Sequence, residues 1–503
     1  MKRNLSLILL IMLLFPVLAF AETEAPEENA RFNMSFSTLL GGNQHDWIGD
    51  VCVDEMGNIY TVGTTFSRQF PITEGKLTDR YAGGASDGFI AKFSPSGELL
   101  FSTLLGGNGI DQCTQITLDP SGYIYVAGVT LSRNFPTTLN AYDRTYNGDV
   151  DIFLTKINPE CDTIIFSTYL GGTEQDHHPM IKIDTSGYIY ISGPTRSSNF
   201  PITANAYDNS YNGTDLNGYY GDIFITKLDH DGEHILYSSF IGGERDESVF
   251  GIDVDPNGIV YLAGITQSTN FPNSHQIFQE SYHGDRSSSN DAFLLAMDCI
   301  EPALKISTIL GGSGDEKLDA ISLDTSGNIF IAGKTSSADF PTTQGAFDEL
   351  HNGEDDLFVL KLNKPGTELI YSTYVGGKNG EGRCDLAINA CGYAFVAGGT
   401  SSDDFPVTPE AIDTTINGGD GQFAFQDVVF FILNPSGTDL LYSTFLGGTG
   451  DDNVFSFQLD KEGAACIGGL TTSSDFPTTA EAFDSTYNGQ RDAFLLRLES
   501  VKP

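Results

Sequence analysis

The feature that most constrains the fold is a hexapeptide that recurs seven times along the chain. Its copies read STLLGG, STLLGG, STYLGG, SSFIGG, STILGG, STYVGG and STFLGG, and they begin 65 to 71 residues apart, at Ser37, Ser102, Ser167, Ser238, Ser307, Ser372 and Ser443. A period of this kind that fills the whole chain indicates a repeat architecture, in which each copy forms one unit and its neighbours complete the core.

Each repeat contains four short segments with the composition of β-strands. In one copy these segments are residues 116–119, 123–128, 151–157 and 164–170. Aromatic and β-branched runs bounded by Asp, Asn, Pro and Gly are typical of strands and hairpins. Several runs are apolar at consecutive positions, which indicates sheets covered on both faces. Radial stacking of four-stranded sheets around an axis provides this cover, and seven sheets lie within the usual range of about four to eight.

The two ends of the chain predict how the ring closes. The chain opens with an unaccompanied fourth strand, residues 36–40, and its last copy stops after the third strand, residues 492–498. The opening strand therefore completes the last blade and removes an exposed sheet edge, whereas an open solenoid would need capping repeats. We predict an all-β fold, a closed seven-bladed β-propeller of four-stranded antiparallel blades, over residues 35–503.

The repeat also carries a family resemblance. STYLGG is followed by a D-x-x-G turn with I-Y-V-A-G, and then by S-S-x-F-P-T-T, A-Y-D, Y-N-G and D-A-F, repeated from Phe36 to Leu498. This pattern closely resembles the bacterial SBBP family of seven-bladed β-propeller repeats. The resemblance implies the fold and a secreted or cell-surface bacterial setting. It implies no established activity and no active site.

The N-terminus predicts export. Two early cations, Lys2 and Arg3, precede an apolar run from Leu5 to Leu18, and Ala19-Phe20-Ala21 stands before Glu22. This order is that of a secretory signal peptide, residues 1–21, which we expect to be followed by a short linker, residues 22–34. A membrane anchor would need about 20 apolar residues. We therefore expect no membrane insertion after cleavage and a secreted, cell-surface or periplasmic location.

The charge of the chain limits its partners. There are 67 Asp and Glu against 26 Lys and Arg, a formal net charge of −41. Such a field repels nucleic acid and anionic membranes, and it attracts cations, including Ca²⁺, or a basic partner. The alternative is that the acidity only keeps a large exported protein soluble and monomeric. We expect a monomer without nucleic-acid partners.

The seven cysteines do not form a recognisable framework. Their number is odd, they occupy no fixed position in the repeat, and they show no CxxC spacing; they are Cys52, Cys113, Cys161, Cys299, Cys384, Cys391 and Cys466. This argues against a disulfide scaffold or a zinc site. Cys384 and Cys391 flank one predicted hairpin turn and are the one pair placed for a bridge. The others are expected to be small buried hydrophobic residues.

The long loops are expected to share one face of the propeller. In an up-and-down blade, the loop between the second and third strands and the connection to the next blade leave the same edge of the sheet, and loops on a rigid scaffold often carry function. An acid follows each Gly-Gly there, and we predict these acids as ligand-binding residues: Asp46, Asp111, Asp176, Asp246, Asp315, Glu381 and Asp451.

A structural role for these acids is the competing interpretation. Each carboxylate would cap its own loop or pair with a cation near the end of a third strand, namely Lys92, Lys156, Lys227, Lys361 and Arg497. Recurrence in every blade favours this role, because a functional site normally needs asymmetry. The Phe-Pro segments also recur seven times, and each Phe is expected to plug its loop onto the blade rather than to join an aromatic collar for glycans.

Departures from the repeat point to candidate metal sites. Three expanded loops, residues 212–222, 283–291 and 417–422, are rich in Asp, Asn and Gly. Oxygen ligands on flexible backbone suit Ca²⁺, and the candidate ligands are Asp215, Asn217 and Asp420. None of the loops has EF-hand spacing, and ordinary turn chemistry explains the same residues. Six loop histidines, His45, His177, His178, His275, His283 and His351, have no metal-site spacing.

No catalytic residue is predicted, because the chain has no G-x-S-x-G, Walker A or H-E-x-x-H motif. The first functional hypothesis is an exported, non-enzymatic binding module that presents its loops to an extracellular protein or glycan. The second is a polysaccharide hydrolase or lyase with its site at the central mouth. The third is a structural surface or matrix component stabilised by Ca²⁺. An asymmetric set of acids and histidines near the axis would favour the enzyme.

Overall fold

The structure is a computed structural model that describes residues 31–78, 80–213, 220–274, 278, 290–419 and 426–501. The predicted signal peptide lies outside the described residues, and so do the candidate calcium ligands Asp215, Asn217 and Asp420. Within the described ranges all regular structure is β-strand, and there is no helix that could span a membrane.

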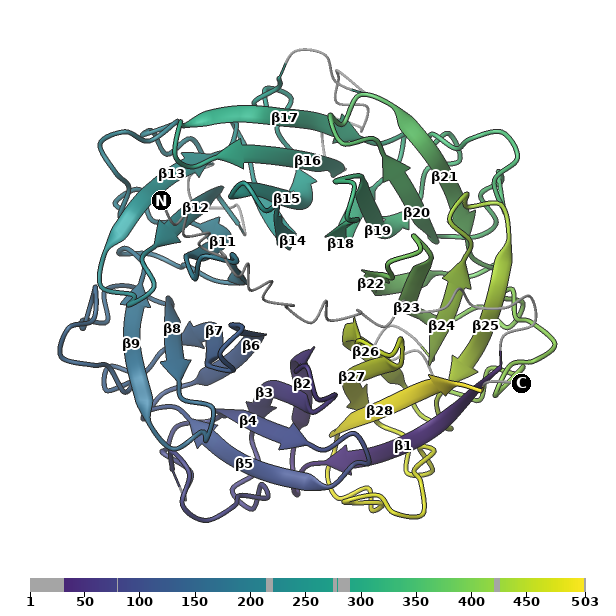
Figure 1. Ribbon diagram of the computed structural model, residues 1–503, viewed down its shortest axis with the longest axis horizontal. Coiled ribbons are helices and arrows are strands. Elements are labelled where there is room, and N and C mark those ends of the chain that lie inside the picture. The colour runs from purple at the N-terminus through teal and green to yellow at the C-terminus, as the bar shows by residue number, and fades with distance from the viewer. Residues whose placement is uncertain are drawn as a thin grey trace, which may run out of the picture.

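Seven four-stranded antiparallel sheets stand in a ring (Figure 1). The first three blades are β2 (Asp46–Val53), β3 (Ile59–Thr65), β4 (Asp87–Phe93) and β5 (Leu99–Leu105); β6 (Asp111–Leu118), β7 (Ile124–Thr130), β8 (Asp151–Ile157) and β9 (Ile164–Leu170); and β10 (Met180–Ile183), β11 (Ile189–Thr195), β12 (Asp222–Leu228) and β13 (Ile235–Ile241). The next three are β14 (Glu247–Val254), β15 (Ile259–Thr266), β16 (Asp291–Asp298) and β17 (Ala303–Leu310); β18 (Glu316–Leu323), β19 (Ile329–Thr335), β20 (Asp356–Leu362) and β21 (Leu369–Val375); and β22 (Glu381–Ile388), β23 (Ala394–Thr400), β24 (Asp427–Leu433) and β25 (Leu440–Leu446).

The last blade joins the two ends of the chain. It contains β26 (Asp452–Leu459), β27 (Ala465–Thr471), β28 (Asp492–Ser500) and, as its outer strand, β1 (Phe32–Leu40). In the antiparallel pair β1 and β28, Ser37 faces Leu496 and Leu39 faces Phe494. The predicted closed seven-bladed propeller is thereby confirmed. The first strand begins at Phe32, three residues before the boundary expected from the sequence.

The core lies between the blades, where seven hydrophobic clusters each join two neighbouring sheets. The second strands β3, β7, β11, β23 and β27 are buried at every residue, as expected for sheets covered on both faces. Each Phe of a Phe-Pro segment is buried, and Phe135 stacks on Phe153 with ring centroids 4.3 Å apart. The plug interpretation of these residues is confirmed.

None of the seven cysteines forms a disulfide. Six are buried, in agreement with the expectation of small core residues, and Cys391 is exposed. The bridge considered between Cys384 and Cys391 is absent because Cys384 lies buried inside β22, whereas Cys391 lies in the exposed turn that follows this strand.

Candidate functional site

In each blade the acid four positions after the second glycine lies at or just before the start of the first strand and is buried. At Asp111, one carboxylate oxygen accepts hydrogen bonds from the backbone N–H of Gly107 and the hydroxyl of Ser132, both at 2.7 Å, and the other accepts one from Thr130 at 2.5 Å. The same arrangement recurs around Asp176, where the three distances are 2.7, 2.9 and 2.5 Å. These contacts support the structural interpretation, in which the carboxylate holds its own loop.

The structure corrects three of the predicted loop acids. The equivalent residues, four positions after the second glycine, are Asp46, Asp111, Asp176, Glu247, Glu316, Glu381 and Asp452. The predicted residues Asp246, Asp315 and Asp451 each stand one residue earlier. Those blades have two consecutive acids, and the prediction fell on the first of the two. The seven equivalent side chains are at most 1 % exposed. They are therefore inaccessible to a large ligand approaching the loops.

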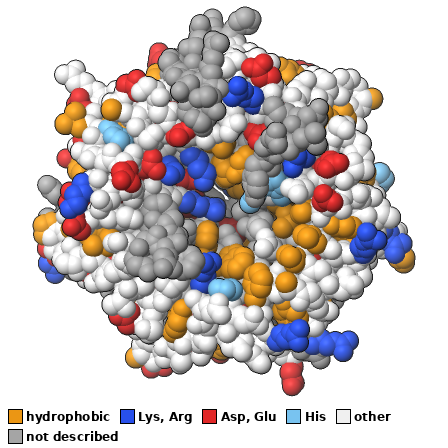
Figure 2. Space-filling view, turned by 180° about the vertical axis from the view of Figure 1, so that it is seen from behind, with side chains coloured by type: hydrophobic (Ala, Val, Ile, Leu, Met, Phe, Trp, Pro, Cys, Tyr) orange, Lys and Arg blue, Asp and Glu red, His pale blue; other side chains and the backbone are white. Residues whose placement is uncertain are grey.

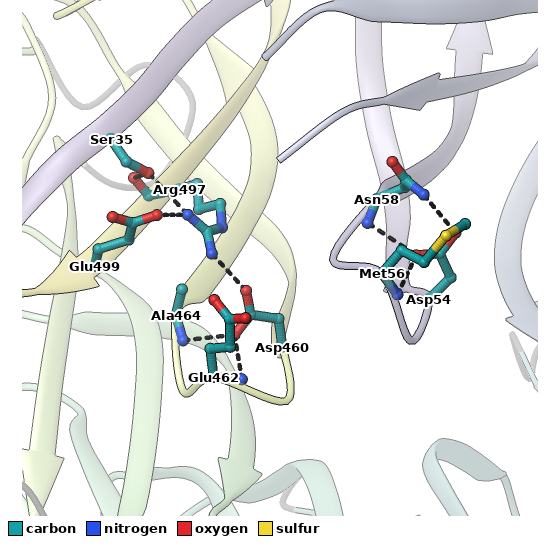
Figure 3. Close-up of polar contacts among 9 residues, drawn as sticks. All are labelled: Ser35, Asp54, Met56, Asn58, Asp460, Glu462, Ala464, Arg497 and Glu499. Atoms are coloured by element: carbon teal, nitrogen blue, oxygen red, sulfur yellow. Dashed lines mark hydrogen bonds and ion pairs between the residues drawn. The ribbon is translucent and has the colours of Figure 1, made fainter. Parts of the chain in front are cut away.

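Four cations of the third strands, Lys92, Lys156, Lys361 and Arg497, pair with a different set of acids, on the opposite face. Figure 3 shows the pair of Arg497 and Asp460. Arg497 donates to Asp460 at 2.6 Å, while Lys92 lies 3.4 Å from Asp54. Asp54 also caps the first turn of its blade by accepting the N–H groups of Met56 and Asn58, both at 2.9 Å. The alternative that these cations pair with the loop acids is wrong, because each third strand begins at the loop face and ends at the other.

The propeller axis is lined by the first strands of all seven blades, which enclose a cavity of about 340 Å³. The inner edges of these strands carry backbone N–H groups that no fifth strand pairs. Side chains of the preceding blade accept several of them: Asp50 accepts Ile116 N at 2.8 Å, Asp253 accepts Leu323 N at 3.0 Å, Asp385 accepts Phe457 N at 2.8 Å and Gln458 accepts Val53 N at 2.7 Å. The axial acids thus tie neighbouring blades together.

The axial carboxylates differ in their electrostatic surroundings. Burial, reinforced by repulsion from Asp385, raises the pKa of Asp50 to about 7 despite its hydrogen bonds. Burial likewise raises the pKa of Asp385 to about 6. Lys182 lies 3.2 Å from Asp253, and the pKa of its ammonium is raised chiefly by this carboxylate. The channel therefore holds both charge signs in an arrangement that differs from blade to blade.

The end of the channel nearest the long loops carries a cluster of cations and aromatic rings. The Lys317 ammonium lies 4.3 Å from the centre of the Phe250 ring and 2.9 Å from Asp319. The Arg383 guanidinium carbon lies 5.7 Å from the centre of the Phe455 ring. Figure 2 shows that basic and hydrophobic side chains gather around the central hollow of this face, while most visible acids lie farther out.

We call this cluster the axial mouth and define it as Lys317, Arg383, His178, Phe250 and Phe455. Irregularities in two inner strands, β22 and β10, place two of these residues, Arg383 and His178. In β6 the bulge falls between Cys113 and Gln115. In β22 the pairing instead shifts between Glu381 and Cys384. Arg383 therefore falls in the bulge and is exposed on the channel. In the third blade β10 begins late, at Met180, and His178 has a φ of +46°.

His178 belongs to this cluster through its electrostatics as well as its place in the chain. Loss of surrounding water, followed by repulsion from the Arg383 guanidinium and the Lys317 ammonium, lowers its pKa. Sequence reasoning noted His178 only as a loop residue and missed Arg383. The usable signal was a charged residue in a first strand at a position where other blades carry an apolar one, such as Val249 or Val454.

Comparisons with known proteins agree with the fold. The family model SBBP, described as a beta-propeller repeat, matches residues 100–136 and 305–341. No match was found among curated proteins.

Three solved structures are similar to this chain at low sequence identity. A protein of unknown function from Dyadobacter fermentans is 11 % identical, with a TM-score of 0.44, over 93 % of this chain and 99 % of that chain. An ulvan lyase of polysaccharide lyase family PL25 is 11 % identical, with a TM-score of 0.45, over 86 % and 93 %. The β-propeller domain of the Trilobed protease from Pyrococcus furiosus is 9 % identical, with a TM-score of 0.41, over 92 % and 97 %. At these scores the likeness carries no argument about function.

Proposed function

We propose that this chain, a seven-bladed β-propeller built of SBBP repeats, is a non-enzymatic binding module whose axial mouth takes an acidic carbohydrate. The observation that carries the proposal is the guanidinium of Arg383. It is exposed on the channel, and no carboxylate of the described residues lies within ion-pair distance of it.

The charge of the axial mouth favours an anionic ligand. The chain has a net charge of −41, yet Arg383 and Lys317 both lie at the loop end of the axis, each beside an aromatic ring. A guanidinium binds a carboxylate or a sulfate through two parallel hydrogen bonds. The surrounding acidic surface repels anions that have no such contact. The cations of the axial mouth therefore favour an anionic ligand that is long or narrow enough to reach the axis over anions that meet only the acidic surface.

The shape and the aromatic rings favour a sugar. A cavity of about 340 Å³ lies near the lower end of the volumes that hold small ligands. The Phe250 and Phe455 rings line it beside the two cations. Rings of this kind bury the apolar face of a sugar while the cations bind its acid group. A chain end or one residue of a uronic-acid polymer fits these features.

The axial carboxylates support binding over glycoside hydrolysis. Asp50 uses one oxygen for Val51 N and the Ser456 hydroxyl, and its other oxygen accepts Ile116 N. Asp385 is held by backbone N–H groups in the same way. A general acid or nucleophile must present an oxygen to the substrate. Both oxygens of each group are instead occupied by hydrogen bonds, and at least one of them joins two blades.

The proposal is tested by calorimetric titration with oligomers of hexuronic acid and with neutral oligomers of the same length. We expect saturable binding of the acidic oligomers alone, weakened by added salt. Arg383→Ala should weaken binding about tenfold or more, corresponding to at least about 1.4 kcal/mol, and Arg383→Lys should weaken it less. Lys378→Ala is the matched control, because Lys378 is an exposed cation that pairs with Asp403 on a peripheral loop.

Three outcomes would contradict this proposal. Equal binding by the wild type and Arg383→Ala would remove the axial mouth as the site. Shortened or unsaturated products would show that the protein is a catalyst rather than a binding module, with His178 as the first candidate base. Binding of acidic peptides but of no acidic glycan would assign a protein partner instead.

We also propose that the protein acts outside the cytoplasm as a monomer. The support is the order of charged, apolar and small residues over positions 1–21 and the closed ring, whose free sheet edges are strands of nine residues or fewer. N-terminal sequencing of the exported protein should begin at Glu22, and light scattering should give the monomer mass. An uncleaved N-terminus or a dimer mass would refute the respective expectation.

A further inference from the structure

Two rings of buried carboxylates meet at the junctions between blades. Each first-strand acid lies beside the Asp that opens the third strand of the preceding blade. The seven pairs are Asp492 with Asp46, Asp87 with Asp111, Asp151 with Asp176, Asp222 with Glu247, Asp291 with Glu316, Asp356 with Glu381, and Asp427 with Asp452. All fourteen side chains are at most 1 % exposed.

The first glycine of each Gly-Gly shows how close the two carboxylates come. A β-carbon on Gly376 would lie 2.5 Å from Asp356 Oδ1 and 2.8 Å from Glu381 Oε2. At Gly447 the corresponding distances are 2.8 Å to Asp427 Oδ1 and 2.7 Å to Asp452 Oδ2. Both carboxylates therefore direct an oxygen toward one small space beside the glycine, and a side chain there would fill it.

In five blades the oxygen of the third-strand Asp lacks a hydrogen-bond partner, whereas in six blades the first-strand oxygen beside it already accepts a hydrogen bond from the second glycine, as Asp452 Oδ2 does from Gly448 N at 2.8 Å. The Oδ2 atom of the third-strand Asp accepts a loop N–H, as Asp492 does from Asn488 at 2.7 Å. The Oδ1 atom is buried without a hydrogen-bond partner in five blades, at Asp87, Asp222, Asp356, Asp427 and Asp492, and so is Oε2 of Glu381. Among the described residues, no Lys, Arg or His nitrogen lies within ion-pair distance of these five aspartates.

A positive charge must therefore accompany each pair. Two carboxylates that share a buried site cannot both stay ionised alone, so the site holds either a proton or a cation. At every junction the atom nearest to the β-carbon position of the first glycine is a carboxylate oxygen. A carbonyl oxygen also lies near one of these carboxylates. A β-carbon on Gly489 would be 3.0 Å from Asp492 Oδ1 and 3.0 Å from the carbonyl oxygen of Gly42. No three acidic, His or Cys side chains of the described residues converge, so carbonyl and hydroxyl oxygens would complete the ligand set.

We propose that the blade junctions are Ca²⁺ sites, in which one cation bridges the paired carboxylates of two neighbouring blades beside the first glycine. Carboxylates and carbonyls are the ligands that Ca²⁺ takes, and it tolerates irregular geometry better than Mg²⁺ does. The sites differ from the predicted ligands Asp215, Asn217 and Asp420, and they do not depend on the proposed function of the axial mouth. Calcium would fasten the ring between its blades.

The test uses the full-length mature protein, stripped with a chelator and dialysed at about pH 8 in about 150 mM KCl, where carboxylates ionise and weak surface binding is screened. Equilibrium dialysis with Ca²⁺ measures the bound stoichiometry, and thermal melts with Ca²⁺ or Mg²⁺ measure the stabilisation. We expect several saturable Ca²⁺ per chain, a melting temperature that rises with Ca²⁺, and a smaller rise with Mg²⁺.

Paired variants separate the junction from the acidic surface. Asp356→Asn combined with Glu381→Gln keeps the shape of one junction but removes its charge, and it should lower the stoichiometry by about one Ca²⁺. Asp403→Asn, at an exposed loop acid, should leave it unchanged. If the paired variant does not fold, the wild-type stoichiometry and melting shift still decide the question.

Two results would overturn the calcium sites. Absence of saturable uptake together with a melting temperature insensitive to Ca²⁺ would exclude them. If, in addition, acidification to about pH 5 without metal stabilises the protein, a shared proton would occupy each junction instead.

Discussion

Replacing Gly376 by alanine tests the crowded space between two blades. The new β-carbon would lie 2.5 Å from Asp356 Oδ1 and 2.8 Å from Glu381 Oε2, well inside contact distance, so the two carboxylates must move apart. Overpacking of this kind costs about 1–3 kcal/mol. Gly380→Ala is the matched control in the same loop, because its nearest neighbour would be Glu354 Oε2 at 3.9 Å. Neither glycine has a positive φ.

The control should be neutral or slightly stabilised, by up to about 1 kcal/mol, because alanine restricts the unfolded chain. The two variants should therefore differ by about 1–4 kcal/mol. Urea unfolding of wild type and both variants, followed by fluorescence, measures this difference from the midpoints at a common slope.

A double-mutant cycle identifies the colliding group. Asp356→Ala removes the nearer carboxylate and loses the cap on Asn352 N, a 2.8 Å hydrogen bond. In the double variant the β-carbon has room, so the loss should be smaller than the sum of the single losses by about 1–2 kcal/mol. If Gly376→Ala unfolds at the same urea concentration as Gly380→Ala, the carboxylates do not converge on this glycine, and the junction geometry is wrong.

Three further predictions follow from buried charge and ring closure. Burial raises the pKa of Asp222 to about 7 and that of Glu381 to about 8. Because these folded-state values exceed the unfolded ones near 4, the stabilisation is complete below about pH 4 and is lost as the pH rises through about 6 to 8. Metal-free melting temperatures should therefore fall from pH 5 to pH 8, and a flat profile would refute the shift. Asp460→Ala removes the 2.6 Å partner of the buried Arg497 but leaves its ion pair with Glu499, so it should cost about 1–3 kcal/mol in urea unfolding, and an unchanged midpoint would show that the pair is dispensable. Deletion of residues 1–40 removes β1 and exposes the edge of β28, so the truncated protein should elute as oligomers or aggregates, and a stable monomer would contradict closure by β1.

The architecture follows from the sequence because its determinants are local and repeated. Seven copies of one four-strand pattern specify seven similar sheets, and strands apolar at consecutive positions require cover on both faces. The single strand at the N-terminal end and the three strands at the C-terminal end together make one complete blade. The recurrent acids and the Phe-Pro segments were also interpretable as structural, since a feature present in every blade serves what every blade needs.

The functional features were not predictable in the same way, because each joins residues from different blades. In three blades the predicted junction acid was one residue too early. There the hydrogen bond to the second glycine distinguishes Glu247, Glu316 and Asp452 from the acids before them. Nothing in the pattern announces that these carboxylates turn inward and meet an Asp of the preceding blade.

The axial mouth depends on the closed ring itself. Arg383 faces the channel because the pairing of β22 shifts by one residue, and His178 approaches it from another blade, more than two hundred residues earlier in the chain. By itself, the sequence determined the number of blades, the strands and their closure, since these depend on hydrophobic patterning along the chain. The tertiary structure alone decided which charges converge, because the distance between blades around an axis is set by packing rather than by sequence separation.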